Sequence, residues 1–160
     1  MEIALPKKAK SVKNESYILI YLLQKADDFM NEAIKYAKKK GKKIVIISTG
    51  LKRQYDAEYV SDCGPEEFLG YFNGADTVFT NSFHGIAFSI LLNKNFYYQL
   101  QGNNVKTNSR LLDIIKMFNL EQRHIDNIEK DDFIDYKEVN GVIEEKRKSA
   151  IKYIEQQITG

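Results

Sequence analysis

The sequence predicts an α/β protein with an open, doubly wound and mainly parallel sheet. Three observations predict it. Short, continuously apolar runs recur along the chain, as in strands that are covered on both faces. Segments with an apolar stripe at helical spacing lie between these runs. Strand, helix and strand follow one another within about thirty residues, which is the length of a βαβ unit with parallel strands.

The first unit begins at an apolar run over residues 16–23, which has the length of a strand. Residues 26–37 carry apolar side chains at positions i, i+3, i+4, i+7, i+8 and i+11, which predicts a helix with one buried face. Gly41 lies just past its end, where a left-handed residue commonly terminates a helix. Residues 44–47 are a second buried strand.

The pattern then continues through a short strand at residues 58–60. Pro65 follows Gly64 and precedes two carboxylates, which predicts the start of a helix that ends at Gly74. Its apolar face comprises Phe68, Leu69 and Phe72.

Two further strands, over residues 77–80 and 95–98, flank a nearly all-apolar and therefore buried helix over residues 83–92. After a loop at residues 102–104, apolar positions up to residue 118 predict an amphipathic helix capped by Asn108.

These elements divide the chain into an irregular linker (1–15), an α/β domain (16–125) and a helical tail (126–160). Asp135 with Glu138 three residues later is typical of a helix start. Apolar residues recur loosely from Val139 to Ile158. The tail therefore either packs back on the domain or docks on a partner domain.

The composition excludes several classes of protein. The 160 residues contain 24 basic and 22 acidic side chains, and a net charge of +2 is too balanced to indicate binding to nucleic acid or to an anionic membrane. Cys63 is alone, which excludes an intrachain disulfide and a cysteine-rich metal site. No apolar run reaches the ~20 residues of a membrane span. We expect a cytoplasmic protein with no metal.

The turn at residues 81–85 is the candidate site. In an open α/β sheet, ligands bind beyond the carboxyl ends of the strands, where neighbouring connections leave in opposite directions. If the strand at 77–80 lies beside the strand at 16–23, this turn lies in that crevice. It also opens a helix, so its N–H groups would form a site for an anion.

The side chains of the turn suit this interpretation. Gly85 would let a ligand approach the backbone closely, and Ser82 either caps the helix or donates its hydroxyl to a ligand. His84 is the side chain there that exchanges protons near neutral pH; the alternative is a structural histidine. Neither glycine fingerprint for phosphate binding, G-x-G-x-x-G or G-x-x-x-x-G-K-[ST], occurs.

From Gly64 to Leu92 the sequence resembles the polysaccharide pyruvyl transferase family. The resemblance is carried by "GPEEFL" at a helix start and above all by Ser82-Phe83-His84-Gly85 between a strand and a helix. Weaker similarity extends over residues 16–123, which include "SYILIYLL" and "NSRLLDIIKMFNLEQR".

The resemblance implies a Rossmann-like fold similar to the C-terminal half of B-type glycosyltransferases, and pyruvyl transfer from phosphoenolpyruvate to a sugar hydroxyl pair of a cell-surface polysaccharide or its precursor. His84 would then be catalytic, and phosphoenolpyruvate would be a substrate rather than a cofactor. The other residues assigned to substrate binding are Asn81, Ser82, Phe83, Gly85, Lys106 and Arg110. The resemblance also implies no cofactor, a place in the cytoplasm either free or peripheral to the inner membrane, and a missing N-terminal domain, without which this chain would be inactive.

Two alternatives stay open: half of a nucleotide-sugar-dependent glycosyltransferase, and a non-catalytic Rossmann-like binding module. For Lys106 and Arg110, a cation on a helix surface is the alternative to a clamp on the donor. Arg123 and His124 follow a helix end and are interpreted as surface residues.

Overall fold

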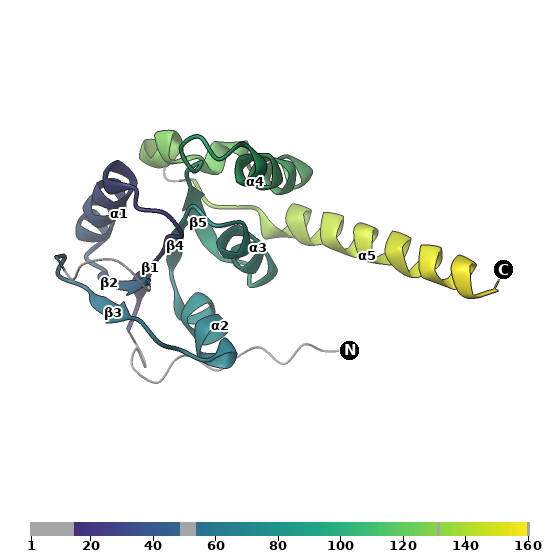
Figure 1. Cartoon of the computed structure of the whole chain (residues 1–160), viewed down its shortest axis with the longest axis horizontal. Helices are drawn as coiled ribbons and strands as arrows, with labels where there is room; N and C mark the ends of the chain where they lie inside the picture. Colours follow the sequence, from purple (N-terminus) through teal and green to yellow (C-terminus); the bar gives the residue numbers. More distant parts are fainter. Residues whose placement is uncertain (1–14, 49–53, 131, 160) are drawn as a thin grey trace.

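A five-stranded parallel sheet lies at the centre of the chain, in the order β3-β2-β1-β4-β5 (Figure 1). The computed structural model describes residues 15–48, 54–130 and 132–159, so all of the predicted linker except Glu15 lies outside the described residues. The strands are β1 (Tyr17–Tyr21), β2 (Lys43–Ile47), β3 (Glu58–Val60), β4 (Thr77–Thr80) and β5 (Asn95–Tyr98). The predicted α/β class and parallel sheet are confirmed.

The strand β1 is central, because it pairs with β2 on one side and with β4 on the other. The chain passes from β1 outward to β2, whereas from β4 it passes outward in the opposite direction to β5. Neighbouring connections therefore diverge between β1 and β4. This is the switch point at which open α/β sheets bind ligands. Because β4 lies beside β1, as the sequence analysis required, the 81–85 turn lies at this point.

Helices cover both faces of the sheet. Residues of β1 alternate between the faces: Ile18 and Ile20 contact α1 (Asp27–Lys40), while Tyr17 and Leu19 face the other layer. That second layer comprises α2 (Pro65–Gly74), α3 (Phe83–Leu91) and α4 (Val105–Met117). Because both faces are covered, the strands are apolar throughout, as their sequences indicate.

The helix ends agree with the sequence in one case and differ in another. Gly41 ends α1 with φ +61, as predicted for a left-handed cap. The prediction that Asn108 caps the fourth helix is wrong, because α4 starts earlier and its cap is Asn104, whose side chain accepts from Thr107 N at 3.3 Å. Two asparagines four residues apart offer the same local signal, and the packing of the helix decides between them.

Arg123 is a second correction, since only 1% of it is exposed. It lies in η2 (Glu121–Arg123), next to β5 at the edge of the sheet. Its Nε donates to Phe96 O at 2.9 Å, and its guanidinium lies 4.2 Å from the centroid of the Tyr97 ring. Arg123 therefore gives a hydrogen-bond partner to a main-chain carbonyl of the edge strand β5, a role that is set by tertiary packing. His124 is half-buried against Tyr98.

The short helix η3 (Ile125–Lys130) packs on the face of the sheet that α1 covers. The last helix, α5 (Tyr136–Thr159), then leaves the domain. The Tyr136 hydroxyl donates to Ser89 O and Lys94 O, and its burial raises the pKa of the phenol, which keeps it a donor. Val139 is 3% exposed, whereas Ile154 is 55% exposed. The expectation that the tail packs back on the domain is thus wrong beyond its first turns, and Figure 1 shows α5 projecting away from the sheet.

None of the helices in the described ranges combines the length and the hydropathy that a membrane crossing requires.

We expect the two parts of α5 to differ in their effect on stability. Val139→Ala should lower the free energy of unfolding by about 2 kcal/mol, because it removes two buried carbon atoms. Ile154→Ala on the projecting part removes three carbon atoms, one more than Val139→Ala, but should alter it by less than about 0.5 kcal/mol because that side chain is exposed. Urea unfolding measures both values, and equal losses would show that the projecting part is packed.

Candidate functional site

The turn after β4 is attached to the loop after β1 by Asn81, which is 1% exposed. Its Oδ1 accepts a hydrogen bond from Leu23 N at 2.9 Å, and its Nδ2 donates to Gln24 O at 2.9 Å. Both ends of the amide are therefore engaged with the main chain. Asn81 holds together the two loops that meet at the switch point.

Gly85 brings α3 onto the end of β4. A Cβ at this position would lie 2.2 Å from Thr80 Oγ1 and 2.9 Å from Thr80 Cβ. Thr80 Oγ1 is itself held in place, since it donates to Tyr21 O at 2.7 Å and accepts from Ser82 N at 3.1 Å. The structure thus gives this glycine a packing reason, whereas the sequence suggested the approach of a ligand; a ligand contact at Gly85 stays a prediction.

Ser82 is the residue before α3, but its side chain makes no capping hydrogen bond. Its Oγ is buried and has no hydrogen-bond partner in the part of the chain that the structure describes. The first-turn N–H groups of residues 83–85 likewise meet no acceptor among the described residues. The start of α3 is therefore a set of unpaired donors at the positive end of the helix dipole.

Arg110 reaches this turn from α4. Its guanidinium carbon lies 4.5 Å from the centroid of the Phe83 ring, and the Phe83 and His84 rings are 5.8 Å apart at an interplanar angle of 83°. His84 and Arg110 are exposed, whereas Phe83, which contacts both of them, is half-buried. The structure thus brings together three of the predicted site residues.

Lys106 is exposed and lies one helical turn before Arg110 on α4. No hydrogen bond, ion pair or ring contact joins its side chain to the 81–85 turn in the described residues, so its predicted role stays a prediction.

Gln101 is a residue at this edge that the sequence analysis missed. It is 4% exposed, and its Nε2 donates to Asn81 O at 2.6 Å. Asn108, predicted only as a helix cap, accepts from Gln101 N at 2.8 Å. No local pattern distinguishes a glutamine in this loop, because its partner is 20 residues away along the chain.

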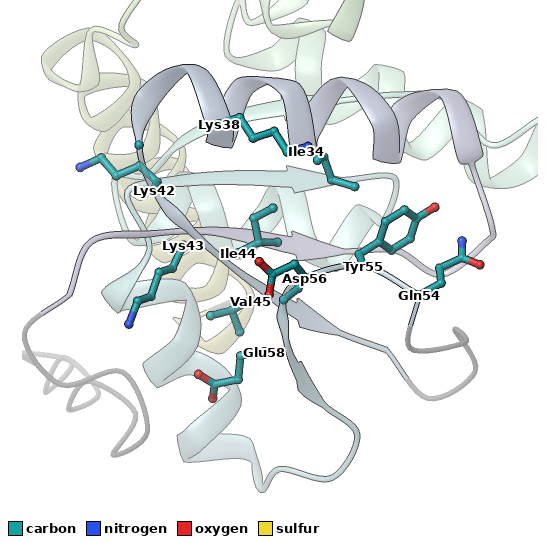
Figure 2. Close-up of a pocket in the computed structure, with 12 residues that line it drawn as sticks. Ile34, Lys38, Lys42, Lys43, Ile44, Val45, Gln54, Tyr55, Asp56 and Glu58 are labelled. Atoms are coloured by element: carbon teal, nitrogen blue, oxygen red, sulfur yellow. The ribbon is translucent and has the colours of Figure 1, made fainter.

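A hollow with a volume of about 730 Å³ lies elsewhere, at the amino edge of the sheet (Figure 2). Two of the lysines that line it have acidic partners: Lys42 lies 3.4 Å from Asp76, and Lys43 pairs with Glu15. Figure 2 shows this hollow beneath the end of α1, beside the starts of β2 and β3. In the described ranges, no three His, Cys, Asp or Glu side chains are grouped as ligands of a metal ion would be.

Comparison with known families gives one match in sequence. The profile of the family described as polysaccharide pyruvyl transferase matches residues 2–98, which include the 81–85 turn. A comparison with curated proteins finds no match.

Solved structures of UDP-GlcNAc 2-epimerases are similar to the chain in fold. The enzyme from Methanocaldococcus jannaschii has 16% sequence identity and a TM-score of 0.45, with 71% of this chain and 42% of that chain covered. Its complex with UDP-GlcNAc and UDP has 14% identity and a TM-score of 0.47, with 84% and 45% covered. The enzyme from Neisseria meningitidis has 10% identity and a TM-score of 0.46, with 88% and 45% covered. The chain spans less than half the length of each of these proteins.

Gly85→Ala is expected to lower the free energy of unfolding by about 1–3 kcal/mol, because the new methyl group overlaps the Thr80 side chain. Gly141→Ala is the matched control: it also lies in a helix, a Cβ there meets nothing within 4 Å, and it should raise stability by up to about 1 kcal/mol. Thermal or urea unfolding decides, and a Gly85→Ala protein as stable as its parent would refute the packing role.

Proposed function

The chain belongs to the polysaccharide pyruvyl transferase family, and we propose that it binds phosphoenolpyruvate at the start of α3 and transfers the pyruvyl unit to a saccharide. One observation supports the choice of this position for the donor. An exposed histidine, unpaired helix amides and an arginine held over the Phe83 ring meet at the switch point of the sheet. Acid–base chemistry and anion binding are thus available side by side.

The donor carries a phosphate and a carboxylate, and the proposed site offers groups for two anions. The amides of residues 83–85 suit one of them, because they are unpaired and lie at the positive end of the α3 dipole. Arg110 suits the other, since a planar guanidinium can bind a carboxylate or a phosphate through two parallel hydrogen bonds. Its contact with Phe83 limits the orientations of the side chain before the ligand arrives. Lys106 adds a second positive charge on the same helix.

The reaction forms two C–O bonds at C2 of the enolpyruvyl group, adds a proton to its methylene carbon and breaks the bond to phosphate. The two saccharide hydroxyls lose the protons, of which one is needed at the methylene carbon and one leaves with the phosphate. His84 is our candidate for moving these protons, because an imidazole both accepts and donates near neutral pH. Its exposure leaves it accessible to a donor and an acceptor together.

The acceptor side of the cleft and the remaining catalytic groups are proposed to come from a further domain that faces the carboxyl edge. Two exposed apolar side chains at this edge support a covering partner: Leu23 is 56% exposed and Val105 is 78% exposed. In this view the chain alone binds the donor but does not complete the transfer. The covering domain and the saccharide are both parts of this proposal.

His84→Ala is expected to lower pyruvyl transfer about 100-fold or more, because a positioned general acid or base contributes about 10²–10⁴-fold. The assay measures phosphate released from phosphoenolpyruvate by the enzyme that carries this chain, with polysaccharide extracted from its source as the acceptor. His124→Ala, at the other histidine, should leave the rate within about twofold. Transfer at the parent rate by the His84→Ala protein would remove this residue from the mechanism.

Arg110→Ala is expected to weaken the binding of phosphoenolpyruvate about 10- to 100-fold, because a charge-assisted hydrogen bond is worth about 1.5–3 kcal/mol. Arg110→Lys should restore only part of the affinity, since lysine lacks the planar fork. Arg147→Ala on the exposed part of α5 is the control. Calorimetric titration measures all four proteins. A parent chain that binds a nucleotide sugar and not phosphoenolpyruvate would favour the glycosyltransferase alternative.

A further inference from the structure

A chain of amide groups links three loops at the carboxyl edge of the sheet. The Asn81 side chain binds Leu23 N and Gln24 O in the loop after β1. The Asn81 carbonyl accepts from Gln101 Nε2, in the loop after β5, at 2.6 Å. The main-chain N–H and C=O of Gln101 are in turn bound by the Asn108 side chain at 2.8 and 3.2 Å. The chain of bonds thus runs from β1 through β4 and β5 to the start of α4.

The two central members of this chain of bonds are hidden from solvent. Asn81 is 1% exposed and Gln101 is 4% exposed. A ligand at the edge of the sheet does not reach them, so they act on it only through the groups that they hold. Because water cannot replace a lost partner at a buried site, each of these bonds matters more than a comparable bond at the surface.

Each end of the chain of bonds holds one part of the proposed donor site. Asn81 directly precedes Ser82 and the unpaired amides of α3. Asn108 lies two residues before Arg110 on α4. Gln101 stands between these two parts, with its side chain bound to one and its main chain bound to the other. Donor binding at two anionic groups requires the two parts at a fixed separation, because small displacements of positioned groups lower binding and rate.

We propose that Gln101 is a positioning residue for the phosphoenolpyruvate site, which sets the separation between the α3 amides and the Arg110 guanidinium. The inference rests on the proposed function, since it assigns those two groups to one ligand. Gln101 touches no substrate in this arrangement; it acts through Asn81 on α3 and through Asn108 on α4.

The test replaces the side-chain amide by an apolar group of similar size. Gln101→Met is expected to weaken the binding of phosphoenolpyruvate about tenfold, which is the effect of losing about one buried hydrogen bond. It should also speed hydrogen exchange at the Leu23 and Ile86 amides, which are bonded to Asn81 and Ser82, about tenfold. Exchange at Leu19, in the centre of the sheet, should not change, whereas a loss of global stability would move all three amides.

Gln99→Met is the matched control, because it makes the same change two residues earlier in the same loop, where no side-chain hydrogen bond is formed within the described residues. It should leave binding and exchange as in the parent. If Gln101→Met does not fold, Gln101→Glu replaces it. The carboxyl group of Glu at this position donates to Asn81 O only when it is protonated. The affinity of the Gln101→Glu protein for phosphoenolpyruvate, relative to that of the parent, should therefore rise as the buffer is changed from mildly alkaline to mildly acidic.

The outcomes separate this inference from the proposed function. A parent chain that does not bind phosphoenolpyruvate overturns both. A parent that binds, together with a Gln101→Met protein that binds equally well, overturns the positioning role alone. If hydrogen exchange at Leu19 accelerates as much as at Leu23 and Ile86, Gln101 contributes only to general stability. The same conclusion follows if the affinity of the Gln101→Glu protein relative to the parent does not change with pH.

Discussion

The contact between Gly85 and Thr80 is the constraint on which the proposed site depends. A helix can begin this close to the end of a strand only if its inward residue has no side chain, since a Cβ would lie 2.2 Å from Thr80 Oγ1. The Thr80 hydroxyl is fixed from the other side by its bond to Tyr21 O. The start of α3 is therefore held on the end of β4, which is bonded to the end of β1, and so lies beside the place where the connections of the sheet diverge.

The residues of this edge fall into two groups with different surroundings. Neutral amides that are almost fully buried, those of Asn81 and Gln101, hold the loops together by hydrogen bonds. The ionisable side chains, those of His84, Lys106 and Arg110, are exposed. Burial of a charge is costly, whereas a buried amide is stable once each of its groups has a partner. The scaffold can thus be rigid while the charged groups keep access to a ligand.

Arg123 and α5 show which features of the structure the sequence pattern did not predict. Apolar runs, helical stripes and helix-end residues identified the five strands and the helices α1 to α4, because burial on two faces leaves continuous apolar runs and one-sided stripes. The interpretation of Arg123 as a surface residue, made from its position after a helix end, was wrong, because the structure buries it against Phe96 and Tyr97. Of the two interpretations of the tail, packing back on the domain was wrong beyond the first turns of α5, because apolar periodicity predicts a helix and does not say what covers it.

By itself, the sequence determined the α/β class, the strand–turn–helix position of residues 81–85 and the resemblance to one family, because these depend on local pattern and on a short motif. Only the tertiary structure decided that Arg110 lies over Phe83, that the amide of Asn81 is engaged with the loop after β1 and that Gln101 joins α3 to α4. The reason is physical: the contacts of Asn81 with Leu23 and with Gln101 join residues 58 and 20 positions apart, and no local propensity encodes which loops the sheet order brings side by side.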